Sequence, residues 1–265
     1  MKFENIKVYN FQHSLYGMRN PKNSWHLIDS EFGIGTIEKA KQMANKVASI
    51  WVQTCPDSET VTDRYNWLMK NGILTQEENI VEYAFIGPKD MRLARALITG
   101  GSEHRKFLRQ IFITFDITAP LYVFKEFDTY KVGTTANSTS TMHKLTSKPI
   151  TLECFEIGDY NESIFDDKAA NPYDEELKVY HHVNSLIDFL EYLRQKYLET
   201  NDIKYWKELV RWLPEGWLQT RTWTGSYENL RTMYHQRKNH KLTEWRDDFC
   251  SMVESLPYAK EFIID

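Results

Sequence analysis

Apolar residues recur along this chain at helical spacing in two long stretches. Between residues 36 and 53 the apolar positions are Ile37, Ala40, Met43, Ala44, Val47 and Ile50. Between residues 175 and 200 they are Leu177, Tyr180, Val183, Leu186, Leu190 and Leu193. Steps of three and four residues place such side chains on one face, so each stretch is predicted to be an amphipathic helix.

Shorter runs rich in β-branched and aromatic residues predict strands between the helices. Residues 79–86 form one such run, residues 111–117 form a second, and residues 218–224 alternate in polarity. Further helices are expected at about 58–71, 89–99, 120–129, 201–212, 226–236 and 241–255.

Short strands interleaved with long helices predict an α+β fold. We expect one domain over residues 1–265, in which long helices pack a small, mostly antiparallel sheet. An N-terminal extension of helices is predicted over about residues 1–75. The acidic stretch 159–176 is predicted to form an excursion on the surface.

Charge and composition narrow the classes of function. A net charge of -4 gives no long-range attraction to nucleic acid or to an anionic membrane, although a local basic pocket is compatible with it. No apolar run approaches the roughly 20 residues of a membrane-spanning helix. The three cysteines lack a C-x-x-C spacing, and residues 1–5 lack the apolar core of a signal peptide. A cytoplasmic location is therefore expected.

Aromatic residues make up 14% of the chain, which is the unusual feature of its composition. Rings packed in the core and at contacts between subunits are one interpretation. A ligand site built from stacked rings is the alternative.

Residues 129–147 form the segment that is most indicative of binding. It is dense in threonine, serine and asparagine, and it contains Lys131, Gly133, His143 and Lys144. Such side chains form hydrogen bonds with phosphate or pyrimidine oxygens, and the lysines add positive charge. An ordinary exposed loop has the same composition. The segment matches neither the P-loop nor the dinucleotide glycine pattern.

Histidines and arginines elsewhere each have two interpretations. His104 precedes a predicted strand, where it serves either as a ligand contact or as a helix cap. Arg231 and Arg237 either stabilise the end of a helix or clamp an anionic ligand. His181 and His182 are adjacent on a helix and point to different faces, so no zinc site is predicted.

The order of these pieces resembles that of the flavin-dependent thymidylate synthases. His104, the strand near residues 113–117 and the Ala-Pro pair at 119–120 resemble the region before the family signature R-H-R-x-x-S-x-N-E-x-S-x-R-Y. Residues 130–143 align with that signature, where Asn137 and Ser140 fit its Asn and its second Ser. Residues 213–237 resemble a second, C-terminal element of the family.

This resemblance implies a homotetramer that binds FAD and dUMP. Members of the family methylate dUMP to dTMP with methylenetetrahydrofolate and NADPH. It implies that Arg237 stabilises charge developing on the pyrimidine. The residues implied to contact the nucleotide are Asn137, Thr139, Ser140 and His143. The residues implied to contact the flavin are His104, Tyr130, Lys131, Ser226 and Thr232.

The chain also departs from the family pattern. Its Tyr130-Lys131-Val132 stands where the family has R-H-R, and Met142-His143 stands where it has R-Y. Two alternatives to thymidylate synthesis therefore remain: modification of another pyrimidine nucleotide, or a scaffold that keeps the fold without catalysis.

Overall fold

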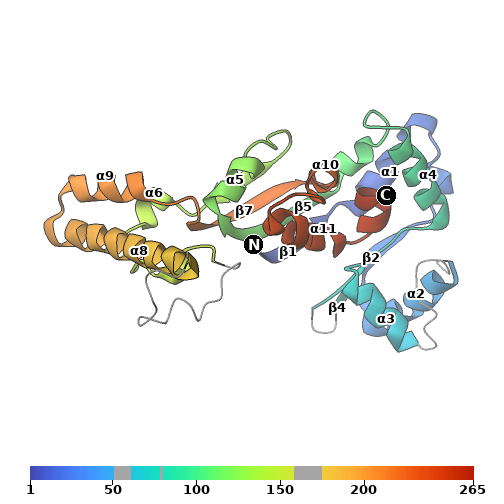
Figure 1. Ribbon diagram of the computed structural model, residues 1–265. Coiled ribbons are helices and arrows are strands. Elements are labelled where there is room, and N and C mark those ends of the chain that lie inside the picture. Colours follow the sequence, from blue (N-terminus) through green and yellow to red (C-terminus); the bar gives the residue numbers. More distant parts are fainter. Residues whose placement is uncertain (51–60, 78–79, 158–174) are drawn as a thin grey trace. The chain divides into compact units, whose positions relative to one another are not determined.

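A computed structural model describes residues 1–50, 61–77, 80–157 and 175–265 (Figure 1). These residues form two compact units. Unit 1 comprises residues 1–2, 116–131 and 136–222, and unit 2 comprises residues 3–115, 132–135 and 223–265. Helices and small sheets occur together along the chain, so the predicted α+β class is confirmed. Whether the chain behaves as one domain stays a prediction.

The larger sheet has four strands in the order β1-β5-β7-β6. Their bounds are Lys2–Tyr9, Phe112–Pro120, Leu218–Ser226 and Thr135–Ser138. Alternate residues of β5 are buried, including Ile113, Phe115 and Ile117, as a strand with one face in the core requires. Phe115 also stacks on Trp223 of β7 with ring centroids 5.1 Å apart.

The smaller sheet is antiparallel and has the order β2-β4-β3. Its strands are Glu31–Thr36, Ile80–Phe85 and Leu74–Glu77, and the helices α2 (Ile37–Ile50) and α3 (Val61–Lys70) accompany them. Gly33 lies opposite Tyr83, and a Cβ on this glycine would come within 3.0 Å of the tyrosine hydroxyl. The predicted N-terminal extension over about 1–75 contains the helices α2 and α3, and it also contains the strands β1 and β2 and the start of β3, which were not predicted. These strands gain their hydrogen bonds from partners elsewhere, which a local pattern does not reveal.

Unit 1 contains a hairpin of two helices, α8 (Glu175–Thr200) and α9 (Ile203–Trp212), which lie side by side (Figure 1). Both helices were predicted close to these bounds. Leu190, Leu193 and Leu209 are buried in a core that also holds Phe155 and Trp217. The predicted acidic excursion lies outside the described residues, except that 175 and 176 begin α8.

Besides α2 and α3, the described part of unit 2 contains four further α-helices. These are α1 (Phe11–Gly17), α4 (Pro88–Thr99), α10 (Tyr227–Arg237) and α11 (Cys250–Glu254). The helix predicted at 241–255 is divided. A π-helical segment η5 (Glu244–Phe249) leads into α11, and a second π-helical segment η6 (Lys260–Ile264) follows. Trp245, Phe249 and Phe262 are fully buried, so these segments carry much of the core of unit 2.

Two of the cysteines lie in the described residues, and both are buried free thiols. These are Cys154 and Cys250. Burial, with a contribution from the Glu254 carboxylate, raises the pKa of the Cys250 thiol to about 11, so this group stays protonated near neutral pH. No helix among the described residues has the length and apolar character needed to span a bilayer.

Candidate functional site

The predicted site residues fall in both units, and each group has its own local geometry. In unit 1 they centre on residues 139–143, which follow β6 and run into the short helix α6 (Thr141–Lys144). This segment is here called the hydroxyl turn. Ser140 caps α6, because its Oγ accepts a hydrogen bond from the His143 backbone N–H at 3.1 Å. The same Oγ lies 2.8 Å from His143 Nδ1. The cap therefore holds a hydroxyl and an imidazole together at the surface.

Thr139 attaches the hydroxyl turn to strand β7. Its backbone N–H donates to the Thr220 carbonyl at 2.9 Å, and its hydroxyl donates to the same oxygen at 3.2 Å. Asn137 is exposed on β6, two residues earlier. The structure thus brings Thr139, Ser140 and His143 together, and the hydroxyl of Ser140 and the imidazole of His143 suit the oxygen atoms of a ligand.

Tyr130 and Lys131 follow helix α5 (Leu121–Phe127) in the same unit. Tyr130 is half-buried and Lys131 is exposed. Their predicted contact with a flavin stays a prediction.

In unit 2, three of the predicted residues belong to helix α10. Thr232 and Arg237 lie in the helix, and Ser226 is its N-cap. Ser226 caps this helix by accepting a hydrogen bond from the Asn229 N–H at 3.3 Å, while its own N–H donates to Asn229 Oδ1 at 3.0 Å. The Ser226 side chain is buried and engaged in this capping box. Its predicted contact with a cofactor stays a prediction beside this structural role.

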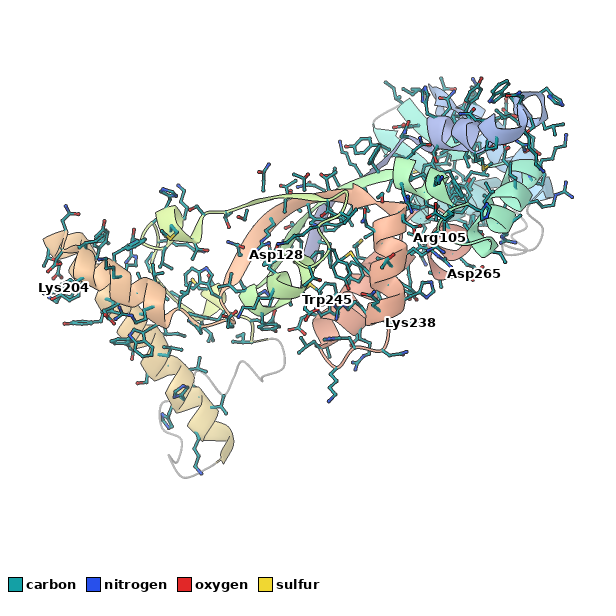
Figure 2. All side chains as sticks on the ribbon, turned by 90° about the horizontal axis from the view of Figure 1, so that it is seen from above. Arg105, Asp128, Lys204, Lys238, Trp245 and Asp265 are labelled. Atoms are coloured by element: carbon teal, nitrogen blue, oxygen red, sulfur yellow. The ribbon has the colours of Figure 1, made fainter. Side chains whose placement is uncertain are left out.

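Arg237 is the last residue of α10. Its guanidinium lies over the ring of Trp245, 4.9 Å from the centroid. Trp245 is fully buried and is labelled in Figure 2. A cation held against a rigid aromatic face loses little freedom when it meets a ligand, which suits the role predicted for Arg237.

Thr232 lines a basic cleft of about 400 Å³. The cleft is lined by Arg105, Arg231, Thr232, His235 and Gln236. Arg105 lies near the N-terminal end of α10, and Lys238 lies just past its C-terminal end (Figure 2).

The two arginines of the basic cleft are held in place by different partners. Arg105 Nε lies 2.8 and 3.1 Å from the two carboxylate oxygens of Glu228. Arg231 Nη1 donates to the Ile263 carbonyl at 2.9 Å. Burial and the nearby charge of Arg105 lower the pKa of Arg231. The two cations thus lie beside two acidic residues, Glu228 and Asp265, both of which act on Arg231. Guanidinium groups form strong charge-assisted hydrogen bonds with anions.

His235 adds a titratable group to the basic cleft. Its Nε2 lies 3.0 Å from the Ile263 carbonyl. Partial burial, then the charges of Arg231 and Lys238, lower the pKa of this imidazole below its ordinary 6.5. The ring is therefore neutral at pH 7 and gains its proton only in more acidic solution.

Sulfate is expected to bind the basic cleft more tightly as the pH falls from about 8 to about 5. A bound anion stabilises the imidazolium form of His235, so protonation and anion binding strengthen each other. Sulfate keeps both its charges over this range, so His235 is the group that titrates. Calorimetric titration at several pH values measures the effect. His235→Gln should flatten the dependence, and an equally steep dependence in that variant would contradict the assignment.

His104 lies in the turn that follows α4 and is exposed. Its ring packs close to Gly100, where an added Cβ would come within 3.2 Å of the imidazole. His104 precedes Arg105 in the chain but is not among the residues that line the basic cleft.

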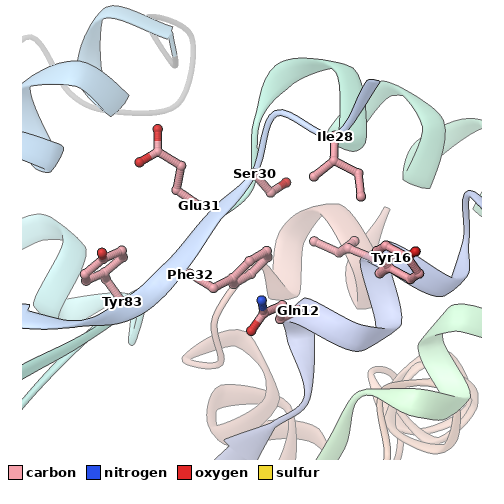
Figure 3. A pocket seen from close by; sticks show the side chains of 8 residues that line it. Gln12, Tyr16, Ile28, Ser30, Glu31, Phe32 and Tyr83 are labelled. Carbon is pink, nitrogen blue, oxygen red and sulfur yellow. The ribbon is translucent and has the colours of Figure 1, made fainter. Parts of the chain in front are cut away.

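A second cavity, of about 320 Å³, lies between α1 and the start of β2 (Figure 3). Its wall includes Gln12, Tyr16, Phe32 and Tyr83. None of the predicted site residues lines it, and neither does any lysine or arginine. Its lining therefore does not suit a phosphate group.

The sequence did not identify Arg105 or His235 as site residues. It gave Arg231 two possible roles, at the end of a helix or as a clamp for an anionic ligand. One signal was present: Arg231 and His235 stand four residues apart and so share a helical face. Arg105 comes from a distant part of the chain, and only the packing of unit 2 shows that it belongs with them.

Comparison with known proteins finds no matching family model and no matching curated relative. Among solved structures, the chain is similar to flavin-dependent thymidylate synthase ThyX from Helicobacter pylori complexed with FAD and dUMP. The TM-score is 0.48 at 17% identity, covering 89% of this chain and 98% of that chain. A second structure of the Helicobacter pylori enzyme with FAD and dUMP has a TM-score of 0.48 at 14% identity, covering 90% and 98% of the two chains.

Proposed function

We propose that this protein binds FAD and a pyrimidine nucleotide and methylates dUMP to dTMP, with methylenetetrahydrofolate as the carbon donor and NADPH as the reductant. The observation that carries the proposal is the basic cleft on α10. This helix lies in the C-terminal element that resembles flavin-dependent thymidylate synthases, and Thr232 of the cleft is one of the residues which that resemblance assigns to the flavin.

The residues of the basic cleft fit the anionic part of FAD. Arg105 and Arg231 both line the cleft, and guanidinium groups pair well with phosphate oxygens. Thr232 and Gln236 add neutral hydrogen-bonding groups. Arg105 and Arg231 would hold the pyrophosphate, and bound FAD would supply the hydride for the reaction. These two arginines provide cations in a chain whose Tyr130-Lys131-Val132 lacks the arginines of the family signature.

The hydroxyl turn is proposed to hold the nucleotide. Ser140 presents a hydroxyl group, and His143 presents an imidazole whose Nδ1 lies against that hydroxyl. Thr139 holds the turn on β7 through its hydroxyl and its backbone N–H. Exposed Lys144 adds a positive charge at the same short helix. Arg237 is proposed to stabilise negative charge on the pyrimidine ring, because a preorganised cation stabilises such charge without reorganising.

A flavin-binding measurement tests the proposal. The purified protein should show flavin absorbance or take up added FAD, and dUMP should raise its thermal midpoint. Arg231→Gln should weaken FAD binding roughly tenfold or more, since charge-assisted hydrogen bonds contribute about 1.5–3 kcal/mol each. The matched control is Arg92→Gln, on the exposed side of α4 in the same unit, which should leave FAD binding unchanged.

A colourless protein that takes up no FAD and shows no thermal shift with dUMP would contradict the proposal. If FAD and dUMP do bind, product analysis with dUMP and dCMP side by side separates thymidylate synthesis from modification of another pyrimidine.

A homotetramer is expected if the proposal holds, and light scattering measures the mass of the assembly.

A scaffold without catalysis is the second candidate, and one observation favours it. Val132, which stands within the position of the family's R-H-R triplet, is 88% exposed and has no charge to offer an anionic ligand. A scaffold would keep its function when Arg237 is replaced and would lose it when exposed aromatic residues such as Trp212 are replaced.

A further inference from the structure

Gln219 on β7 forms hydrogen bonds with the residue before Ser140 and the residue after it in the hydroxyl turn. Its Nε2 donates to the Thr139 carbonyl at 2.9 Å and to the Thr141 hydroxyl at 3.1 Å. Gln219 is 8% exposed, so both amide hydrogens are used in a place that water barely reaches. One side chain thus fixes the residue before Ser140 and the residue after it.

Arg221, two residues further along β7, fixes the orientation of this amide. Its Nε donates to Gln219 Oε1 at 2.8 Å. An amide has one accepting end and one donating end, and Arg221 only donates. The oxygen of Gln219 must therefore face Arg221, and its NH2 must face the hydroxyl turn.

Arg221 is in turn anchored to the core of unit 1. Its guanidinium lies over the ring of Phe124 at 3.9 Å from the centroid, and Phe124 is 1% exposed. Its Nη1 donates to Asp128 Oδ1 at 2.7 Å, just past the end of α5. A planar guanidinium that both stacks and pairs has little freedom to move.

We propose that Gln219 and Arg221 are positioning residues that set Ser140 and His143 for the nucleotide. They act through the backbone and hydroxyl groups of the hydroxyl turn. This inference rests on the proposed function only where it names the nucleotide as the ligand of that turn. These contacts connect a short polar segment at the surface to a buried aromatic ring through two side chains.

Gln219→Glu is the most specific test, because it replaces the donating NH2 of the amide with an oxygen and keeps the other oxygen. A carboxylate still accepts from Arg221 but cannot donate to Thr139 or Thr141. In the ligand-free protein, the imidazole nitrogen signals of His143 in an NMR spectrum should shift, reporting a changed contact with Ser140. The dissociation constant for dUMP should rise roughly tenfold. The matched control is Gln42→Glu, at an exposed position of α2, which should change neither measurement.

Arg221→Lys is a second variant, useful if Gln219→Glu does not fold. Lysine keeps the charge but loses the planar stacking on Phe124, so the His143 signals should shift in the same direction by a smaller amount. Unchanged His143 signals in both folded variants would overturn the positioning role. If the unaltered protein does not bind dUMP, the proposed function fails, while the His143 signals of the ligand-free protein still decide the positioning role.

Discussion

Replacing Asp90 by alanine is expected to lower the free energy of unfolding by about 3–5 kcal/mol. The Asp90 carboxylate is fully buried and pairs with Arg19, with Oδ1 2.7 Å from Nε and 2.6 Å from Nη2. Its Oδ2 also accepts from the Ser30 hydroxyl at 2.6 Å and from the Ser30 N–H at 3.1 Å. Removing the carboxylate leaves a buried guanidinium without its counter-charge, and it removes one of the acceptors that connect α4 to the segment before β2.

Urea unfolding followed by circular dichroism measures this loss. The control is Asp188→Ala on the exposed face of α8, which should change the free energy of unfolding by no more than about 0.5 kcal/mol. Replacing both partners with apolar residues, as in Arg19→Met with Asp90→Leu, should cost less than Asp90→Ala alone, because no buried charge then remains. Equal losses for Asp90→Ala and Asp188→Ala would contradict this account.

Replacing Arg237 by alanine is expected to reduce the rate of dTMP formation at least about 100-fold under the proposed function. The guanidinium of Arg237 is half-buried and held over Trp245. Because it is proposed to act on charge that develops during the reaction, kcat should fall far more than the affinity for dUMP.

Steady-state kinetics with dUMP and methylenetetrahydrofolate measure this effect. Trp245→Phe should lie between the unaltered protein and Arg237→Ala, because the smaller ring gives a weaker cation–π contact. The control is Arg211→Ala at the exposed end of α9, which should keep the full rate. Full activity in Arg237→Ala would exclude the catalytic role and favour the scaffold.

The elements predicted best are those whose pattern is long and local. Helix α8 occupies Glu175–Thr200, the bounds expected from its apolar spacing, and β5 occupies most of its predicted run. Strands β1 and β6 were missed because most of their residues are exposed, and all of β6 is. Such segments become strands through hydrogen bonds to β5 and β7, and their own composition does not require it.

The candidate site likewise has one part that the sequence predicted and one part that it did not. The hydroxyl turn was found in the sequence because its serine, threonine and histidine residues are neighbours in the chain. The basic cleft was not found, because Arg105 and Arg231 meet only through the packing of unit 2. The burial that lowers the pKa of His235 likewise has no counterpart in the sequence.

The sequence by itself determined which residues form most helices, where the short polar turn lies and which side chains are available for binding. Those properties depend on contacts within a few residues, so a linear pattern carries them. Only the tertiary structure decided that Arg105 faces the same cleft as Arg231, and that Gln219 reaches the two sides of Ser140. Such contacts join residues far apart in the chain, and the packing of the core selects them.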